Sequence, residues 1–178
     1  MNPKSGVRSL IYQAPVFKVW RQPVTFDDGL QTSYEYVDHQ GSVTIAAVTD
    51  ENRLWFVRQY RHPAGRQLLE FPAGTLEAGE LPEQCARREC QEEIGHRPGE
   101  IHALGGYYLA PGYSTERTLL FLARDLQPGQ LPGDEDERLE AESYSLEEVY
   151  ELIADGEIED AKTLAGLLLV LPLLDTAG

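Results

Sequence analysis

Cysteine, histidine and cationic side chains are scarce in this sequence. Its 178 residues include 2 cysteines, 4 histidines and 15 lysines and arginines, against 30 aspartates and glutamates. Cys85 and Cys90 lie five positions apart in a predicted helix, so they point in different directions and are not expected to bond to each other. We expect both to be small buried or half-buried residues. No serine or cysteine arrangement suggests a covalent nucleophile.

Long apolar runs are also missing. The longest, residues 164–174, is too short to span a bilayer and contains Pro172. It predicts a buried C-terminal helix. The first residues lack the apolar core of a secretory signal. We therefore expect a cytoplasmic protein that does not associate with membranes.

The formal net charge is −15. This charge argues against nonspecific binding to nucleic acid or to anionic membranes. A phosphate-containing substrate would have to be neutralised locally, by metal ions and well-placed arginines.

The periodicity of the chain predicts interleaved strands and helices without regular βα units, and thus an α+β or mixed α/β fold in one domain. Residues 42–48 form a mostly apolar strand, which we expect to pair in a hairpin with residues 53–60. A loop rich in glycine and proline follows. The remaining predicted elements are strands at 17–20, 33–37, 101–109, 117–123 and 139–144 and helices at 82–94, 145–155 and 160–174, the second of these opened by a capping box at Ser145.

One motif carries the chemistry. Seven positions fit the pattern G-x5-E-x7-R-E-U-x-E-E-x-G, where U is apolar, and they are Gly74, Glu80, Arg88, Glu89, Glu92, Glu93 and Gly95. On a helix, Glu89 and Glu93 lie about 40° apart, and Glu92 lies about 60° from Glu89 on its other side. Three carboxylates on one turn repel each other unless a cation binds among them. Oxygen ligands without histidine or cysteine suit Mg2+ or Mn2+. The alternative is an ordinary charged, exposed helix face, which we prefer for Glu83.

This pattern resembles the Nudix box. Cys90 and His96 depart from it, because the family prefers aliphatic or apolar residues there. The resemblance implies a mixed α/β/α sandwich, the Nudix fold, here preceded by an N-terminal antiparallel strand region. It also implies two or three Mg2+ ions, for which Mn2+ can substitute. The carbonyl of Ala73 would hold the metals with Glu89 and Glu93, and Glu92 would share or bridge them. Gly74, Glu80, Arg88 and Gly95 would support the box.

Shorter segments resemble the ADP-ribose pyrophosphatase branch of that family. Pro111 follows Gly95 by 16 positions, a spacing that marks the branch. The resemblance implies that Arg61 binds phosphate, that Glu70 accepts hydrogen bonds from a base or ribose edge, and that Tyr113 and Pro111 lie along the substrate. Each of these residues also has an ordinary interpretation, as a surface charge, a strand end or a turn.

In this branch a glutamate from a loop activates water. Glu135 is the first candidate for that catalytic base and Glu137 the second, with Glu92 contributing from the metal site. An ordinary acidic loop is the alternative. The implied reaction is hydrolysis of the pyrophosphate of ADP-ribose to AMP and ribose 5-phosphate.

Two other functions stay open. One is a pyrophosphatase for GDP-mannose or another nucleotide sugar, and the other is a catalytically inactive Nudix module that only binds a nucleotide. The partner we expect is a small nucleoside diphosphate sugar, not nucleic acid. Residues 1–40 would form a strand region that mediates a homodimer, as in this branch, and residues 41–178 the hydrolase domain.

Overall fold

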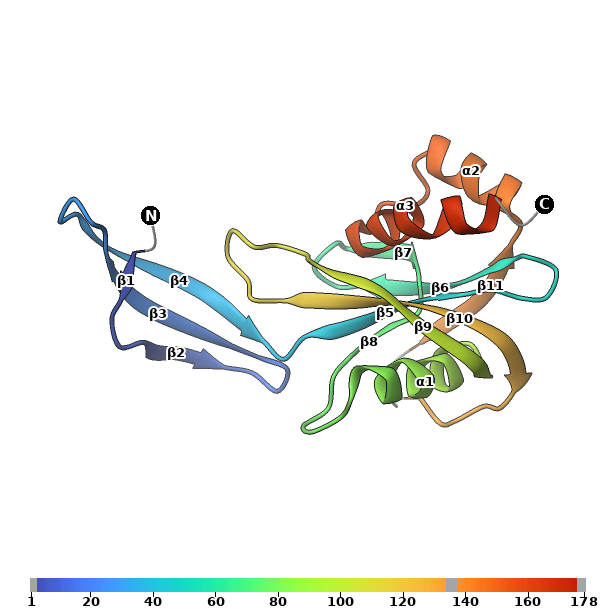
Figure 1. Ribbon diagram of the computed structural model, residues 1–178, viewed down its shortest axis with the longest axis horizontal. Coiled ribbons are helices and arrows are strands. Elements are labelled where there is room, and N and C mark those ends of the chain that lie inside the picture. Colours follow the sequence, from blue (N-terminus) through green and yellow to red (C-terminus); the bar gives the residue numbers. More distant parts are fainter. Residues whose placement is uncertain (1–2, 134–137, 176–178) are drawn as a thin grey trace. The chain divides into compact units, whose positions relative to one another are not determined.

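The chain divides into two compact units. The computed structural model describes residues 3–133 and 138–175. The first unit joins Met1–Gly41 with Tyr108–Arg117, and the second joins Ser42–Tyr107 with Thr118–Gly178. Figure 1 shows the elements of each.

The first unit is an antiparallel sheet built around one long strand. β3 (Phe17–Thr25) pairs along its whole length with β4 (Gln31–His39), and its other edge is shared by β1 (Lys4–Ser5) and β2 (Ser9–Gln13). Val24 is the one side chain of these four strands that is buried. The segment 108–117 is fastened to β4, because Val37 accepts a hydrogen bond from Thr115 N–H and donates one to the carbonyl of Tyr113.

The second unit contains two sheets. The mixed sheet has the order β8-β5-β10-β9, and its strands are β8 (Ala73–Thr75), β5 (Ser42–Ala47), β10 (Arg117–Pro128) and β9 (His96–Tyr108). β5 and β10 are parallel, with Ser42 opposite Thr118. The other sheet is antiparallel, with β6 (Leu54–Arg61) between β11 (Leu139–Tyr144) and β7 (Arg66–Glu70).

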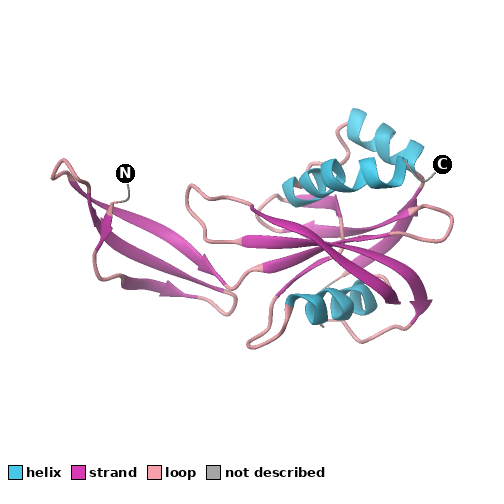
Figure 2. Ribbon diagram, in the orientation of Figure 1, coloured by secondary structure: helices cyan, strands magenta, loops and turns pink. Residues whose placement is uncertain are grey.

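Helices cover both faces of these sheets, as Figures 1 and 2 show. α1 (Pro82–Glu93) lies on one side, and α2 (Leu146–Ala154) and α3 (Ala161–Asp175) lie on the other. The period-two alternation of a strand decides which residue faces which layer. Thus Ile45 of β5 packs in the cluster of α1, whereas its neighbour Ala46 packs in the cluster of α3. This arrangement is the predicted α/β/α sandwich.

The predicted hairpin between residues 42–48 and 53–60 is wrong. The two segments are joined only by a bridge between Val48 and Leu54, after which they enter different sheets. All six residues of β5 are buried, and its two edges are filled by β8 and β10. A strand with both neighbours in place has no free edge for β6.

The stretch predicted as a glycine- and proline-rich loop contains two short strands, β7 and β8. Tertiary pairing overrides their weak local propensity, since β7 pairs with β6 and β8 pairs with β5.

The helices begin where the sequence predicts. In α2, Ser145 Oγ accepts from Glu148 N–H at 3.3 Å and Glu148 Oε2 accepts from Ser145 N–H at 2.7 Å, which is the predicted capping box. α3 corrects the expectation of a fully buried helix, because Leu167 is buried whereas Leu168 is 75% exposed. Among the described residues, no helix is long and apolar enough to cross a membrane.

Candidate active site

α1 presents the glutamates of the motif to β8. Pro82 occupies its first turn, where the missing N–H costs nothing, and Gln84 Oε1 accepts from Leu81 N–H at 3.1 Å. Cys85, Ala86 and Cys90 anchor one face of the helix in the core. Beside them, Glu89 and Glu93 are only 7% and 8% exposed.

Glu89 fits against a glycine. A Cβ atom at Gly74 would lie 1.7 Å from Glu89 Oε1 and 2.0 Å from its carboxylate carbon. Gly74 sits in β8, opposite Val43 of β5. The first glycine of the motif therefore leaves the space that the Glu89 carboxylate occupies.

Glu93 is fixed by the same strand. Its Oε2 accepts a hydrogen bond from the backbone N–H of Ala73 at 2.9 Å. Ala73, predicted to offer its carbonyl to a metal, thus also orients one of the predicted ligands. Gly95 ends the helix just beyond, with a φ of 70° that favours glycine.

Arg88 holds three glutamates of the motif. Its Nε lies 2.9 Å from Glu80 Oε1, and its Nη1 lies 2.7 Å from Glu89 Oε1 and 2.8 Å from Glu92 Oε2. The hydrogen bond from Arg88 lowers the pKa of Glu80 to about 2. The same carboxylates raise the pKa of Arg88, so this guanidinium stays charged.

The chemistry of this face suits a hard cation. Glu80, Glu89 and Glu92 surround Arg88, so two negative charges are left over around this arginine (3 − 1 = 2), and Glu93 adds a further carboxylate to the same face. Over residues 3–133 and 138–175, no three histidine, cysteine, aspartate or glutamate side chains are gathered as a metal site. Arg88 Nη1 instead lies between the carboxylates of Glu89 and Glu92. Carboxylate oxygens in such excess match the ligand preference of Mg2+.

A second cluster surrounds Glu70, at the end of β7. This carboxylate is 1% exposed and receives Arg61 Nε on Oε1 and Arg61 Nη2 on Oε2, both at 2.8 Å. Lys162, at the start of α3, donates to the same Oε2. Burial alone would raise the pKa of Glu70, but the hydrogen bonds and charges of Arg61 and Lys162 outweigh it and lower that pKa.

Sequence reasoning assigned no role to Lys162. Residues 156–163 resemble the ADP-ribose pyrophosphatase branch, but this resemblance marks no single residue among them. Glu70 and Lys162 are 92 positions apart, and no local pattern joins them.

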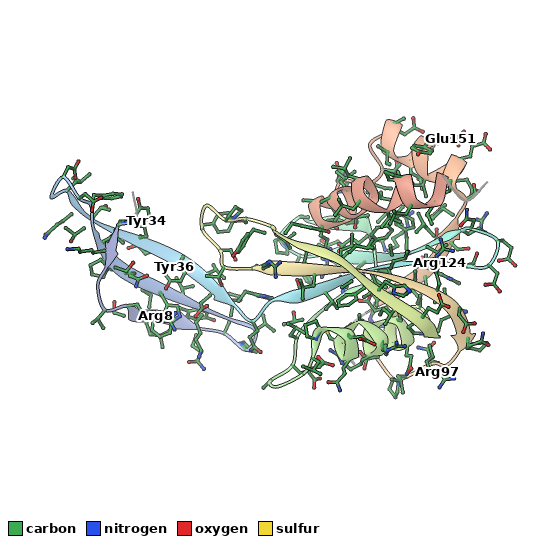
Figure 3. The ribbon with its side chains drawn as sticks, viewed as in Figure 1. Arg8, Tyr34, Tyr36, Arg97, Arg124 and Glu151 are labelled. Carbon is green, nitrogen blue, oxygen red and sulfur yellow. The ribbon has the colours of Figure 1, made fainter. Side chains whose placement is uncertain are left out.

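Pro111 and Tyr113 belong to the first unit. They line a pocket of about 360 Å³ whose wall is formed by β4 and the segment that follows β9, namely by Tyr34, Glu35, Tyr36, Pro111, Gly112, Tyr113, Ser114 and Thr115. Figure 3 shows Tyr34 and Tyr36 on β4, and Arg8 in the connection between β1 and β2. Arg8 lies 4.1 Å from the ring centre of Trp20 and 3.1 Å from Asp38.

Two predicted residues lie outside the described part of the chain. Glu135 and Glu137, the candidate bases, fall within residues 134–137, which the structure does not describe.

The cysteines behave as the sequence predicts. Both are buried and free of disulfide bonds. Burial raises the pKa of Cys90 to about 12 and raises that of Cys85 as well, so both thiols stay protonated near neutral pH. Neither is an activated nucleophile.

The fold and this glutamate face define a class of protein. The family model for the NUDIX domain matches residues 38–167. The chain belongs to the Nudix family, and it is a hydrolase that acts on pyrophosphate bonds. Nudix hydrolases generally depend on a divalent metal.

Relatives within the family are similar over most of their length. An ADP-ribose pyrophosphatase of Bacillus subtilis (strain 168) is 34% identical over 92% of this chain and 89% of its own. A GDP-mannose pyrophosphatase of Enterobacter sp. (strain 638) is 35% identical over 73% of each. The crystal structure of an ADP compounds hydrolase matches with a TM-score of 0.88 at 26% identity, covering 100% of this chain and 97% of the other.

Proposed function

We propose that this protein is a Mg2+-dependent pyrophosphatase that cuts ADP-ribose into AMP and ribose 5-phosphate. The observation that carries the proposal is the glutamate face of α1, where Glu89 fills the space at Gly74 and Glu93 accepts from Ala73 N–H. Similarity to an ADP-ribose pyrophosphatase over 92% of the chain supports the choice of substrate.

Glu89, Glu92 and Glu93, with the carbonyl of Ala73, are the proposed ligands of two or three Mg2+ ions. Bound Mg2+, or Mn2+ in its place, would neutralise the pyrophosphate and acidify a water molecule. The chain's own contribution is to hold the carboxylates ready. Arg88 keeps Glu89 and Glu92 from separating, and β8 fixes Glu93.

Arg61 is proposed to bind a phosphate of the substrate, because its planar fork of donors matches phosphate oxygens. Its side chain is 39% exposed, so part of the guanidinium is open to a ligand. Glu70 is proposed to accept a hydrogen bond from the base or ribose. Pro111 and Tyr113 are proposed to lie along the substrate, and the exposed ring of Tyr113 supports this for that residue.

Glu135 is the proposed general base, and Glu137 is its alternative. A carboxylate near the attacked phosphorus would accept the proton of the water, and the in-line displacement then needs no covalent intermediate. Two further proposals are a homodimer formed through the N-terminal sheet and a location in the cytoplasm.

A second candidate function is hydrolysis of GDP-mannose or another nucleotide sugar. The relative named as a GDP-mannose pyrophosphatase favours it, at 35% identity. A nucleotide-binding module without activity is a further alternative, but all seven motif positions are intact, which argues against it.

A hydrolysis screen separates these functions. The purified protein with Mg2+ is incubated with ADP-ribose, GDP-mannose, other sugar nucleotides, diadenosine polyphosphates, NADH and nucleoside triphosphates, and kcat/KM is measured for each. We expect ADP-ribose to rank first, with AMP and ribose 5-phosphate as products. A higher kcat/KM for GDP-mannose would replace the substrate, and turnover of none would support the binding module.

A further inference from the structure

Glu70 is a buried carboxylate that accepts hydrogen bonds from two cationic side chains, Arg61 and Lys162. Arg61 engages both of its oxygens, whereas Lys162 engages Oε2 alone. A carboxylate that is 1% exposed needs a positive partner at all times, because the protein interior solvates an isolated charge poorly. Either cation could meet that need without the other.

The two cationic side chains differ in how far they are enclosed. The Lys162 side chain is 12% exposed and also lies 3.0 Å from Asp160 Oδ2. Its backbone carbonyl accepts a hydrogen bond from Tyr107 Oη of β9 at 2.6 Å. The next residue, Thr163, accepts from Phe71 N–H at 2.8 Å, which ties the start of α3 to the end of β7.

The backbone of Arg61 is held as well, in the β6–β7 ladder opposite Arg66, so the two residues differ in their side chains. Arg61 lies at the end of β6, its side chain is 39% exposed, and its guanidinium donates to Glu70 through Nε and Nη2. Besides Glu70, the charges of Glu93 and Asp160 raise its pKa, so Arg61 stays cationic beside the glutamate face.

We propose that Arg61 exchanges between Glu70 and a phosphate of the substrate, and that Lys162 is the positioning residue that keeps Glu70 paired while Arg61 turns away. The proposal rests on the proposed function. It also reconciles two roles, because departure of Arg61 releases Glu70 Oε1 to accept a hydrogen bond from the substrate while Lys162 retains Oε2. Without Lys162, Glu70 would hold Arg61 back and the substrate would have to break the pair unaided.

The test is a double-mutant cycle on ligand affinity. The Kd of the α,β-methylene analogue of ADP-ribose is measured with Mg2+ by calorimetry, for wild type, Lys162→Gln, Glu70→Gln and the double variant. We expect Lys162→Gln to weaken binding at least about ten-fold, and less than about two-fold when Glu70 is already Gln. Lys162→Arg, which keeps the charge, should stay within about two-fold of wild type. With ADP-ribose as substrate, Lys162→Gln should raise KM and leave kcat nearly unchanged.

Two results would overturn the proposal. A folded Lys162→Gln variant with unchanged affinity would show that the ion cluster is only structural. An equal loss in both backgrounds would show that Lys162 touches the ligand itself. If Lys162→Gln does not fold, Lys162→Met takes its place in the same cycle: an unchanged affinity, or an equal loss in the wild-type and Glu70→Gln backgrounds, contradicts the exchange. Failure of wild type to bind or cut any sugar nucleotide would instead remove the proposed function.

Discussion

Glu93 is the residue at which the backbone of β8 and the carboxylate face of α1 meet. Replacing it by Gln keeps an oxygen that can accept from Ala73 N–H, but removes the charge that a divalent cation needs. We expect Glu93→Gln to lower kcat by several orders of magnitude while the thermal midpoint of unfolding changes little. Glu83→Gln on the same helix is the matched control, since Glu83 pairs only with Arg87 on the exposed side and should leave kcat unchanged. Near-normal turnover of Glu93→Gln would refute the metal assignment.

Gly74 sets the geometry of Glu89 by having no side chain. In Gly74→Ala the new Cβ would overlap the carboxylate of Glu89, so we expect activity to fall steeply and unfolding free energy to drop by about 1–3 kcal/mol. Gly6→Ala is the control, because a Cβ there meets its nearest atom at 3.4 Å. Adding Glu89→Ala to Gly74→Ala should restore part of the stability, though not the activity. Denaturant titration measures the unfolding free energies of Gly74→Ala, Glu89→Ala and the double variant. Losses that simply add would contradict the steric account.

At the level of single residues, the sequence predicts which like charges cluster on one helix, but it does not predict which opposite charges pair across the fold. Glu89, Glu92 and Glu93 could be placed together because helical spacing is a local property. The pairing of Glu70 with Lys162 could not, because it depends on how β7 and α3 meet after the chain has folded.

α3 shows the energetic contrast between two neighbouring leucines. Leu167 is 1% exposed and packs in the core, whereas Leu168 is 75% exposed. Leu167→Ala should therefore lower the unfolding free energy by about 2–5 kcal/mol. Leu168→Ala should change it by less than about 0.5 kcal/mol. Urea denaturation of the two variants measures both, and similar losses would mean that the exposed face is covered in solution.

Helices were easier to predict than strand pairings. A proline marks the start of α1 and a glycine follows its end, and a capping box marks the start of α2. All three signals lie within a few positions of the helix. The hairpin from residues 42–48 to 53–60 was wrong because a short turn predicts proximity, while the choice of partner depends on distant β8 and β10. Likewise, β7 and β8 become strands only through their neighbours.

At the scale of the whole molecule, the N-terminal sheet leaves apolar side chains in water. Val7, Leu10, Ile11, Tyr12 and Leu30 are all exposed. Large apolar side chains left exposed on one small sheet favour an interaction surface there. We expect light scattering to give a mass of twice the 19.9 kDa chain.

The homodimer can be tested by charge insertion in this sheet. Ile11→Glu should weaken the dimer, whereas Ser9→Glu, on the same exposed strand, serves as the control. A clean monomer for wild type in dilute solution would contradict the proposed homodimer.

The parallel pairing of β5 with β10 also determines when, during translation, this enzyme can complete its fold. Ser42 and Thr118 are 76 positions apart (118 − 42 = 76), so the central pair of the mixed sheet closes a long loop. Contacts of such separation form slowly, and a growing chain folds in the order in which it is synthesised. During translation the motif helix emerges before β10, the strand that completes its core. A ribosome-bound chain stalled before residue 118 should thus carry every proposed metal ligand without the strand that completes the core beneath them, and should be inactive.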